Sequence, residues 1–197
     1  MAKKTESTLV NMVLALGGIA LVASALLGFV YQVTKGPIEI TKAKILQEAI
    51  QQVSPSDLAD ITLGEKYMLA VVNNDSLDCY PVLDAEGKLQ ATAIATYTDD
   101  GFSGRFKIMV GFKPDGTIIN TAVLEHAETP GLGDKMDKGK SEWSYQYNDK
   151  NPSNFDVKVT KDGGEVDAIT AATITSRAFS DAVDRAYNAY MKGGNHE

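Results

Sequence analysis

An uninterrupted apolar segment near the N-terminus constrains this chain more than any other feature of its sequence. No charged residue occurs between Glu6 and Lys35, and residues 9–33 are almost all apolar. A helix over that range rises about 1.5 Å per residue and reaches roughly 37 Å, enough to cross a hydrocarbon core of about 30 Å. The sequence therefore predicts one transmembrane helix over residues 9–33, preceded by a cytoplasmic tail over residues 1–8.

A cleaved signal peptide is the alternative interpretation of the same segment. Ala23-Ser24-Ala25 has the small-x-small form of a cleavage site. Apolar residues resume immediately, from Leu26 to Val30, which favours an uncleaved anchor.

The orientation of this span is not fixed by charge alone, because lysines flank it on both sides. Long domains translocate largely regardless of charge, and the tail before the span is short. We therefore expect a single-pass protein of the cell (inner) membrane, with its N-terminus in the cytoplasm and its domain on the periplasmic or extracellular side.

The charge balance excludes some classes of function. The chain has 19 Lys and Arg against 26 Asp and Glu, a formal charge of -7. A nucleic-acid partner is not expected, since such a partner requires a basic surface. Cys79 is the single cysteine, so the chain alone cannot supply a disulfide framework or a multi-cysteine metal site. No metal site is predicted.

The rest of the chain has the pattern of an α+β domain. Apolar residues at helical spacing after Gly36-Pro37 predict an amphipathic helix that ends before Ser54-Pro55, within a juxtamembrane helical segment and connector over residues 34–79. A second apolar stripe, starting at Ile174, predicts a last helix that stops at Gly193-Gly194.

Between these helices the periodicity changes to that of strands. Two predicted hairpins have turn residues at 84–87 and 113–116. The four predicted strands cover residues 80–83, 89–97, 105–112 and 117–124, and a further strand is expected over 155–159. The expected architecture is one transmembrane helix followed by a mainly antiparallel sheet packed by helices, with the ligand-binding domain over residues 80–197.

The segment Asp167–Ser176 is the most informative for chemistry. Its small residues and hydroxyls lie at the start of the last helix, where free backbone N–H groups favour an anion such as phosphate. The alternative is that these hydroxyls only cap the helix. Three threonines and one serine within seven residues exceed what one cap requires.

A second segment, Glu125–Lys135, has the composition of a loop around a flat ligand. Pro130, Gly131 and Gly133 allow sharp turns and close backbone approach, and Thr129 and Lys135 can supply hydrogen-bond donors. An ordinary turn would have a similar composition. His126 lacks the partners of a catalytic histidine, and Cys79 is more typical of a small buried residue than of a nucleophile.

Together the two segments resemble the FMN-binding domain family that includes the G subunit of the Rnf ion-translocating ferredoxin:NAD oxidoreductase. The C subunit of the sodium-translocating NADH:quinone reductase is a related member. In this family a threonine in the pattern Asp-x-x-[Ser/Thr]-Gly-Ala-[Thr/Ser] carries FMN through a phosphoester. Asp167, Thr170, Ala172 and Thr173 match that pattern, and Ala171 replaces the usual glycine.

The resemblance implies that Thr173 is the covalent FMN attachment residue and that a dedicated flavin transferase loads it from FAD. It implies a redox subunit of a larger membrane complex, not a complete enzyme, with further membrane and peripheral subunits as partners. Arg177 is a further candidate for holding the phosphate charge. The implied cofactor-binding residues are Glu128, Thr129, Pro130, Gly131, Leu132, Gly133, Lys135, Asp167, Thr170, Ala171, Ala172 and Thr175.

Three other functions remain open at this stage. The short tail, the single span and the absence of long insertions favour the G subunit over the quinone-reductase C subunit, which is the main alternative and differs in the partners that co-purify with it. An anchored sensory or ligand-binding domain would hold a phosphate-bearing molecule reversibly. An assembly subunit without flavin would follow if Ala171 blocks attachment.

Overall fold

The computed structural model describes residues 8–56, 62–71 and 75–193. The chain divides into two compact units, Met1–Lys44 and Ile45–Glu197. Outside the described residues lie residues 1–7 of the predicted tail, parts of the predicted connector, and Gly194.

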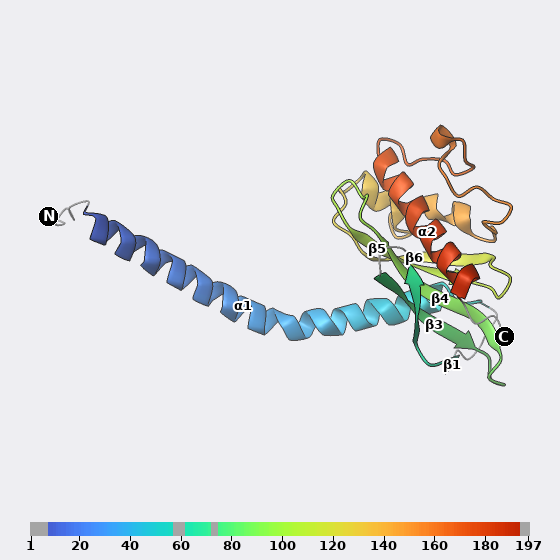
Figure 1. Cartoon of the computed structure of the whole chain (residues 1–197), viewed down its shortest axis with the longest axis horizontal. Helices are drawn as coiled ribbons and strands as arrows, with labels where there is room; N and C mark the ends of the chain where they lie inside the picture. Colours follow the sequence, from blue (N-terminus) through green and yellow to red (C-terminus); the bar gives the residue numbers. More distant parts are fainter. Residues whose placement is uncertain (1–7, 57–61, 72–74, 194–197) are drawn as a thin grey trace. The chain divides into compact units, whose positions relative to one another are not determined.

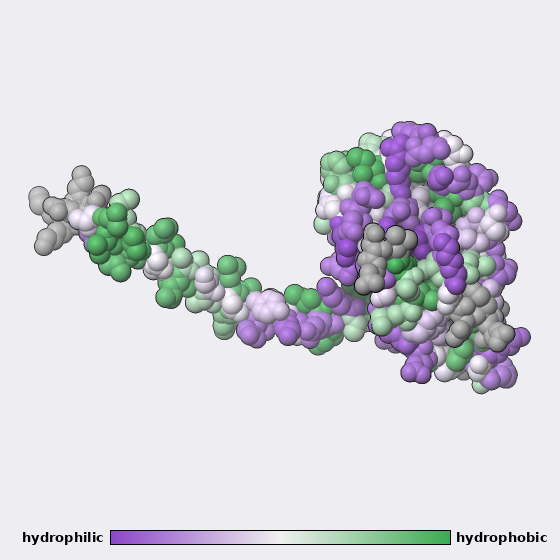
Figure 2. All heavy atoms as spheres, in the orientation of Figure 1, coloured by the Kyte–Doolittle hydropathy of each residue, from purple (hydrophilic) through white to green (hydrophobic). Residues whose placement is uncertain are grey.

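The N-terminal apolar segment belongs to a single helix, α1 (Leu9–Gln52). Large apolar side chains along its first half are exposed, and the face visible in Figure 2 is mostly apolar there. The helix is long and apolar enough to cross a membrane.

The expectation of separate helices before and after Gly36-Pro37 is wrong, because α1 continues through Pro37 (Figure 1). A proline inside a helix removes one backbone donor but does not always end the helix. The predicted end before Ser54-Pro55 is confirmed, and Ser54 Oγ donates to the carbonyl of Ile50 at 2.6 Å.

The second unit contains an antiparallel sheet whose strands pair in the order β1-β3-β4-β5-β6, with β2 also paired to β3. The strands are β1 (Thr62–Leu63), β2 (Tyr67–Val71), β3 (Asp75–Leu83), β4 (Leu89–Thr98), β5 (Phe106–Phe112) and β6 (Ile118–Glu125). The two predicted hairpins are confirmed as β3–β4 and β5–β6.

Two features of the sheet differ from the prediction. The short strands β1 and β2 lie in the stretch assigned to the connector, so the compact unit begins well before residue 80. Residues 155–159 do not form a strand, because only Val159 makes a bridge, to Val166. The boundary of the flavin-binding part at residue 80 stays a prediction.

Helices cover both faces of the sheet. On one face α2 (Thr173–Gly193) packs through Phe179, Val183 and Tyr190 against a core that includes Ile108 and Val110. On the other face the end of α1 contributes a second, smaller core, made of Ala49, Ile50, Val53, Val82, Ala91, Ala93, Met109 and Ala122. The sheet is therefore buried between two helices of distant sequence.

The polar region after the sheet forms short 3-10 helices, not open loops. These are η2 (Gly133–Met136), η3 (Trp143–Tyr147) and η4 (Thr160–Asp162). Trp143 meets Phe179 edge to face with ring centroids 5.2 Å apart, and Tyr147 is fully buried beside it. This aromatic cluster fixes the region against α2, close to the helix start that carries the candidate attachment residue.

Candidate functional site

The two segments singled out in the sequence meet at one cavity of about 300 Å³, although some 40 residues separate them in the chain. Its lining is mainly apolar, and Thr173 lies at the first residue of α2. The lining residues are Phe102, Glu128, Thr129, Leu132, Gly133, Ala171, Ala172, Thr173, Ile174 and Thr175.

Glu128 joins three segments of the chain around this cavity. The residue is only 5% exposed. Its Oε2 accepts a hydrogen bond from Thr175 Oγ1 at 2.7 Å, and its Oε1 accepts one from the backbone N–H of Ser103 at 3.0 Å. Hydrogen bonds to a buried carboxylate are stronger than neutral ones. Glu128 therefore ties the start of α2 and the β4–β5 loop to its own loop.

The two glycines of that loop have different roles. Gly131 has φ of +77°, and a side chain added there would meet nothing within 4 Å. A Cβ added at Gly133 would lie 2.7 Å from Thr175 Oγ1 and closer still to Glu128 Oε2. A left-handed backbone thus occurs at Gly131, and the close backbone approach expected in this loop occurs at Gly133.

The hydroxyl of Ser176 shapes the turn that enters α2. Its Oγ accepts a hydrogen bond from the backbone N–H of Ile169 at 2.9 Å and donates to the carbonyl of Ala172 at 3.0 Å. Because the Ser176 hydroxyl donates to Ala172 and the Thr175 hydroxyl donates to Glu128, neither has its proton free to donate to a bound anion. Thr170 is exposed.

The backbone amides at the start of α2 are available. Within the described residues, the N–H groups of Thr173, Ile174 and Thr175 take part in no hydrogen bond. The first turn of α2 has no acidic residue. Unpaired N–H groups and the positive end of the helix dipole favour a bound anion here.

Lys161 is the basic residue in contact with the candidate attachment residue. Its Nζ donates to Thr173 Oγ1 at 3.1 Å. The other candidate cations lie elsewhere: Lys135 does not line the cavity, and Arg177 is held by Asp162 through bonds of 2.6 and 2.7 Å. Arg177 in turn holds the pKa of the Asp162 carboxyl below its usual value.

Asp167 contributes through its backbone. Gln146 Oε1 accepts from the Asp167 N–H at 2.8 Å, while Gln146 Nε2 and Trp143 Nε1 donate to the Asp167 carbonyl at 3.2 and 2.5 Å. These bonds anchor the chain before the α2 turn to η3. The Asp167 side chain is not part of the cavity lining.

Ala171 has a left-handed backbone, with φ of +61°. This conformation costs a residue with a Cβ roughly 1 to 2 kcal/mol and costs glycine much less. The usual glycine at this position thus has a physical reason, and the fold accommodates alanine at some cost in stability.

We therefore expect Ala171→Gly to raise the stability of the domain by about 1 kcal/mol, since the strain removed exceeds the extra entropy of an unfolded glycine. Thermal unfolding of the full chain in detergent measures the change. Ala127→Gly, at an exposed position without positive φ, is the control and should not stabilise. An equal or lower melting temperature for Ala171→Gly would contradict the strain.

Eight of the thirteen residues predicted for the site line the cavity, and five do not. Pro130, Gly131, Lys135, Asp167 and Thr170 lie outside the lining. Phe102 and Ile174 line the cavity and Lys161 contacts Thr173, but none of the three is among the residues predicted for the site. Phe102 lies in a loop that carries no motif, Ile174 is predicted only as part of the apolar stripe of the last helix, and Lys161 lies outside both predicted segments.

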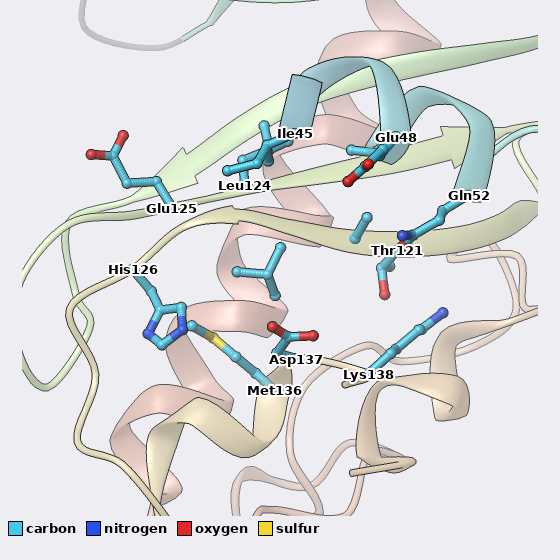
Figure 3. Close-up of a pocket in the computed structure, with 13 residues that line it drawn as sticks. Ile45, Glu48, Gln52, Thr121, Leu124, Glu125, His126, Met136, Asp137 and Lys138 are labelled. Carbon is cyan, nitrogen blue, oxygen red and sulfur yellow. The ribbon is translucent and has the colours of Figure 1, made fainter. Parts of the chain in front are cut away.

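A second hollow, of about 420 Å³, lies between the end of α1, β6 and the segment after η2 (Figure 3). Burial lowers the pKa of Lys138 there to about 8, and its Nζ lies 4.4 Å from the centre of the Tyr145 ring. The lining includes the carboxylates of Glu48, Glu125 and Asp137, which disfavour a phosphate. The α2 cavity therefore fits a phosphate-bearing ligand better.

His126 and Cys79, which the sequence indicates are structural residues, have structural surroundings. His126 accepts a hydrogen bond from the Glu128 backbone N–H at Nδ1, 3.1 Å away, and so supports the loop. Cys79 is fully buried, and burial raises the pKa of its thiol to about 12, which suppresses the reactive thiolate.

Comparison with known proteins defines the class to which this fold and site belong. The model of a family described as "FMN-binding domain" matches residues 101–188, a range that includes both segments of the cavity and Lys161. The domain is thus an FMN-binding domain.

Relatives of known name extend the match over most of the chain. The G subunit of the ion-translocating oxidoreductase complex of Shewanella amazonensis is 36% identical over 188 residues, covering 91% of this chain and 87% of the relative. The G subunits of Vibrio cholerae serotype O1 and Aliivibrio fischeri are 37% and 39% identical, covering 88% and 89% of this chain and 86% of each relative. The chain belongs to this family of G subunits.

A crystal structure of NqrC from Shewanella oneidensis is also similar. It aligns with a TM-score of 0.47 and 20% identity, covering 73% of this chain and 70% of that chain.

Proposed function

We propose that this chain is a membrane-anchored electron-transfer subunit that carries FMN on Thr173 through a phosphoester. The complex would be an ion-translocating ferredoxin:NAD oxidoreductase, in which the chain provides one redox station and other subunits provide the ion path. Its membership of the G-subunit family and its apolar helix support this proposal.

One observation carries the proposal for Thr173. Its hydroxyl lies at the first residue of α2, where three backbone amides are unpaired within the described residues, and at the edge of an apolar cavity. A phosphodiester retains one negative charge, which these amides can bind. The residues present therefore fit a flavin with its phosphate at the helix start.

The chain's own residues would orient the cofactor and exclude water from it. Leu132 and Ile174 give the cavity apolar walls, and Phe102 offers an aromatic ring for contact with a flat ligand. Glu128 fixes the loops that carry these walls. When bound, FMN supplies one- and two-electron chemistry, and a phosphoester leaves its ring unaltered.

Replacement of Thr173 tests the attachment. The protein produced with a flavin transferase should carry one FMN, seen as an added mass and as in-gel flavin fluorescence, and peptide mapping should place it on Thr173. Thr173→Ala should lose both signals and remain folded, since the one hydrogen bond that its hydroxyl makes among the described residues is with an exposed lysine. Thr173→Ser should retain some flavin. Flavin on another residue, or an unmodified wild-type protein, would disprove the assignment.

The membrane topology is tested with a reporter fused after Glu197. We propose that the N-terminus is cytoplasmic and that the domain lies on the periplasmic or extracellular side. A reporter that is active only in the cytoplasm should then be silent, and one that is active only after export should work. If the cytoplasmic reporter were active and the export-dependent reporter silent, the orientation would be the reverse. A mature N-terminus near Leu26 would show that the apolar segment is cleaved as a signal peptide.

The main alternative is the C subunit of a sodium-translocating NADH:quinone reductase. Subunits that co-purify with the full chain separate the two complexes, because the partner enzymes differ. A reversible sensory domain is disfavoured by the FMN-binding family match, and it would release its ligand on denaturation.

A further inference from the structure

The start of α2 has an electrostatic arrangement that is unfavourable without a bound anion. Negative side chains, not positive ones, stabilise the N-terminal end of a helix. The first turn of α2 has no acidic residue, and the ammonium of Lys161 lies against it through Thr173. The positive end of the dipole and a cation thus meet at one hydroxyl.

The neighbouring arginine does not share this role. Arg177 forms a two-bond ion pair with Asp162, so each offsets the charge of the other. Asp162 follows Lys161 directly in η4, and this ion pair fixes the short helix to α2. Gly163 has a left-handed backbone, with φ of +89°, and Gly164 lies so close to the carbonyl of Lys158 that a Cβ would not fit there. These two glycines form the turn that follows η4. The backbone that carries Lys161 is therefore held close to Thr173.

We propose that Lys161 is the cationic partner of the attachment hydroxyl and promotes loading of flavin on Thr173. This inference rests on the proposed function. The Lys161 ammonium donates to Thr173 Oγ1, which leaves the hydroxyl proton free for a base and stabilises negative charge that develops on this oxygen.

The loading step balances without an oxidant or reductant. Thr173 Oγ1 forms a bond to the FMN-side phosphorus of FAD, and the bond from that phosphorus to the bridging oxygen of the pyrophosphate breaks. AMP leaves with that oxygen, and the hydroxyl proton passes to a base or to solvent. The product diester carries one negative charge, which the Lys161 ammonium and the α2 amides can both offset.

The rate of flavin loading tests this role directly. Purified full chain without flavin is incubated in detergent with FAD and a flavin transferase, and intact mass is followed with time. Loss of a charge-assisted hydrogen bond at the reacting oxygen should slow loading of Lys161→Gln about tenfold. Lys161→Arg retains the charge and should recover most of the rate. Lys158→Gln, the same charge change at an exposed position on the same segment, should load like wild type.

A second measurement does not depend on the transferase. The ³¹P resonance of a phosphodiester depends on the charges and hydrogen-bond donors beside it. At neutral pH, Lys161→Gln that has been loaded to completion by longer incubation should therefore show a ³¹P resonance displaced from that of loaded wild type, because the ammonium of Lys161 is absent. Loaded Lys158→Gln should show the wild-type resonance.

The outcomes separate this inference from the proposed function. Wild-type protein that accepts no flavin on Thr173 would disprove the attachment itself. If wild type is loaded on Thr173 and Lys161→Gln loads at the same rate and shows the same ³¹P resonance, only the role of Lys161 is wrong. Circular dichroism establishes that the compared variants are equally folded.

Discussion

Glu128→Ala should destabilise the extramembrane domain by about 2 to 4 kcal/mol. The change leaves the hydroxyl of Thr175 and the N–H of Ser103 without their acceptor in a buried setting, and each lost bond to a carboxylate is worth about 1.5 to 3 kcal/mol. Relief of the carboxylate's own burial offsets part of this loss. Thermal unfolding of the full chain in detergent measures the effect.

Two variants provide the comparison for Glu128→Ala. Thr175→Val removes one of the two bonds with little change in shape, so its loss should be smaller. Glu86→Ala removes an exposed glutamate in the β3–β4 turn and should change the stability by less than about 0.5 kcal/mol. If Glu128→Ala matched Glu86→Ala, Glu128 would not join the three segments, and the cavity would need another explanation.

Gly133→Ala should disrupt the same cluster from the opposite side, with a loss of roughly 3 kcal/mol. The added methyl would approach Thr175 Oγ1 and the Glu128 carboxylate more closely than contact distance allows. Those two groups are hydrogen-bonded to each other, so neither can move away without breaking their bond. Overpacking of this kind costs about 1 to 3 kcal/mol, and the lost bond adds to it.

Gly131→Ala is the matched control, two residues away in the same loop. It has open space for a methyl but positive φ, so only backbone strain of about 1 kcal/mol is expected. In flavin-loaded protein, Gly133→Ala should also alter the flavin absorption spectrum, and Gly131→Ala should alter it less. Equal effects of the two variants would show that close packing at Gly133 does not shape the site.

Much of the fold could be predicted from the sequence because its signals are local. The apolar run, the two hairpin turns and the apolar stripe of the last helix each lie within one stretch of the chain. β1 and β2 could not be predicted because they are short and partly exposed. The apolar stripe predicts a buried Ile174, yet this residue is 48% exposed, since its side chain lines the cavity at the first turn of α2.

Only those residues of the site that lie in recognisable sequence motifs could be predicted. The loop at Glu128 and the turn at Thr173 are separate signals, and their meeting could be inferred only through a family resemblance. Lys161 contacts Thr173 because the Asp162–Arg177 ion pair joins η4 to α2. Asp162 and Arg177 are 15 residues apart in the chain, and the periodicity of the sequence gives no sign of a contact between them. The Glu128–Thr175 bond spans 47 residues and depends on the complete fold.

The end of α1 limits where the domain can be separated from its anchor. Ala49, Ile50 and Val53 are buried, and Gly111 is so close to Val53 that even a methyl would not fit between them. A soluble fragment that starts at Pro55 would expose the apolar surface of β4 and β5 to water and would tend to aggregate. A protease that releases a functional domain must therefore cut before Ile45, and the last two turns of the anchor helix would leave with the domain.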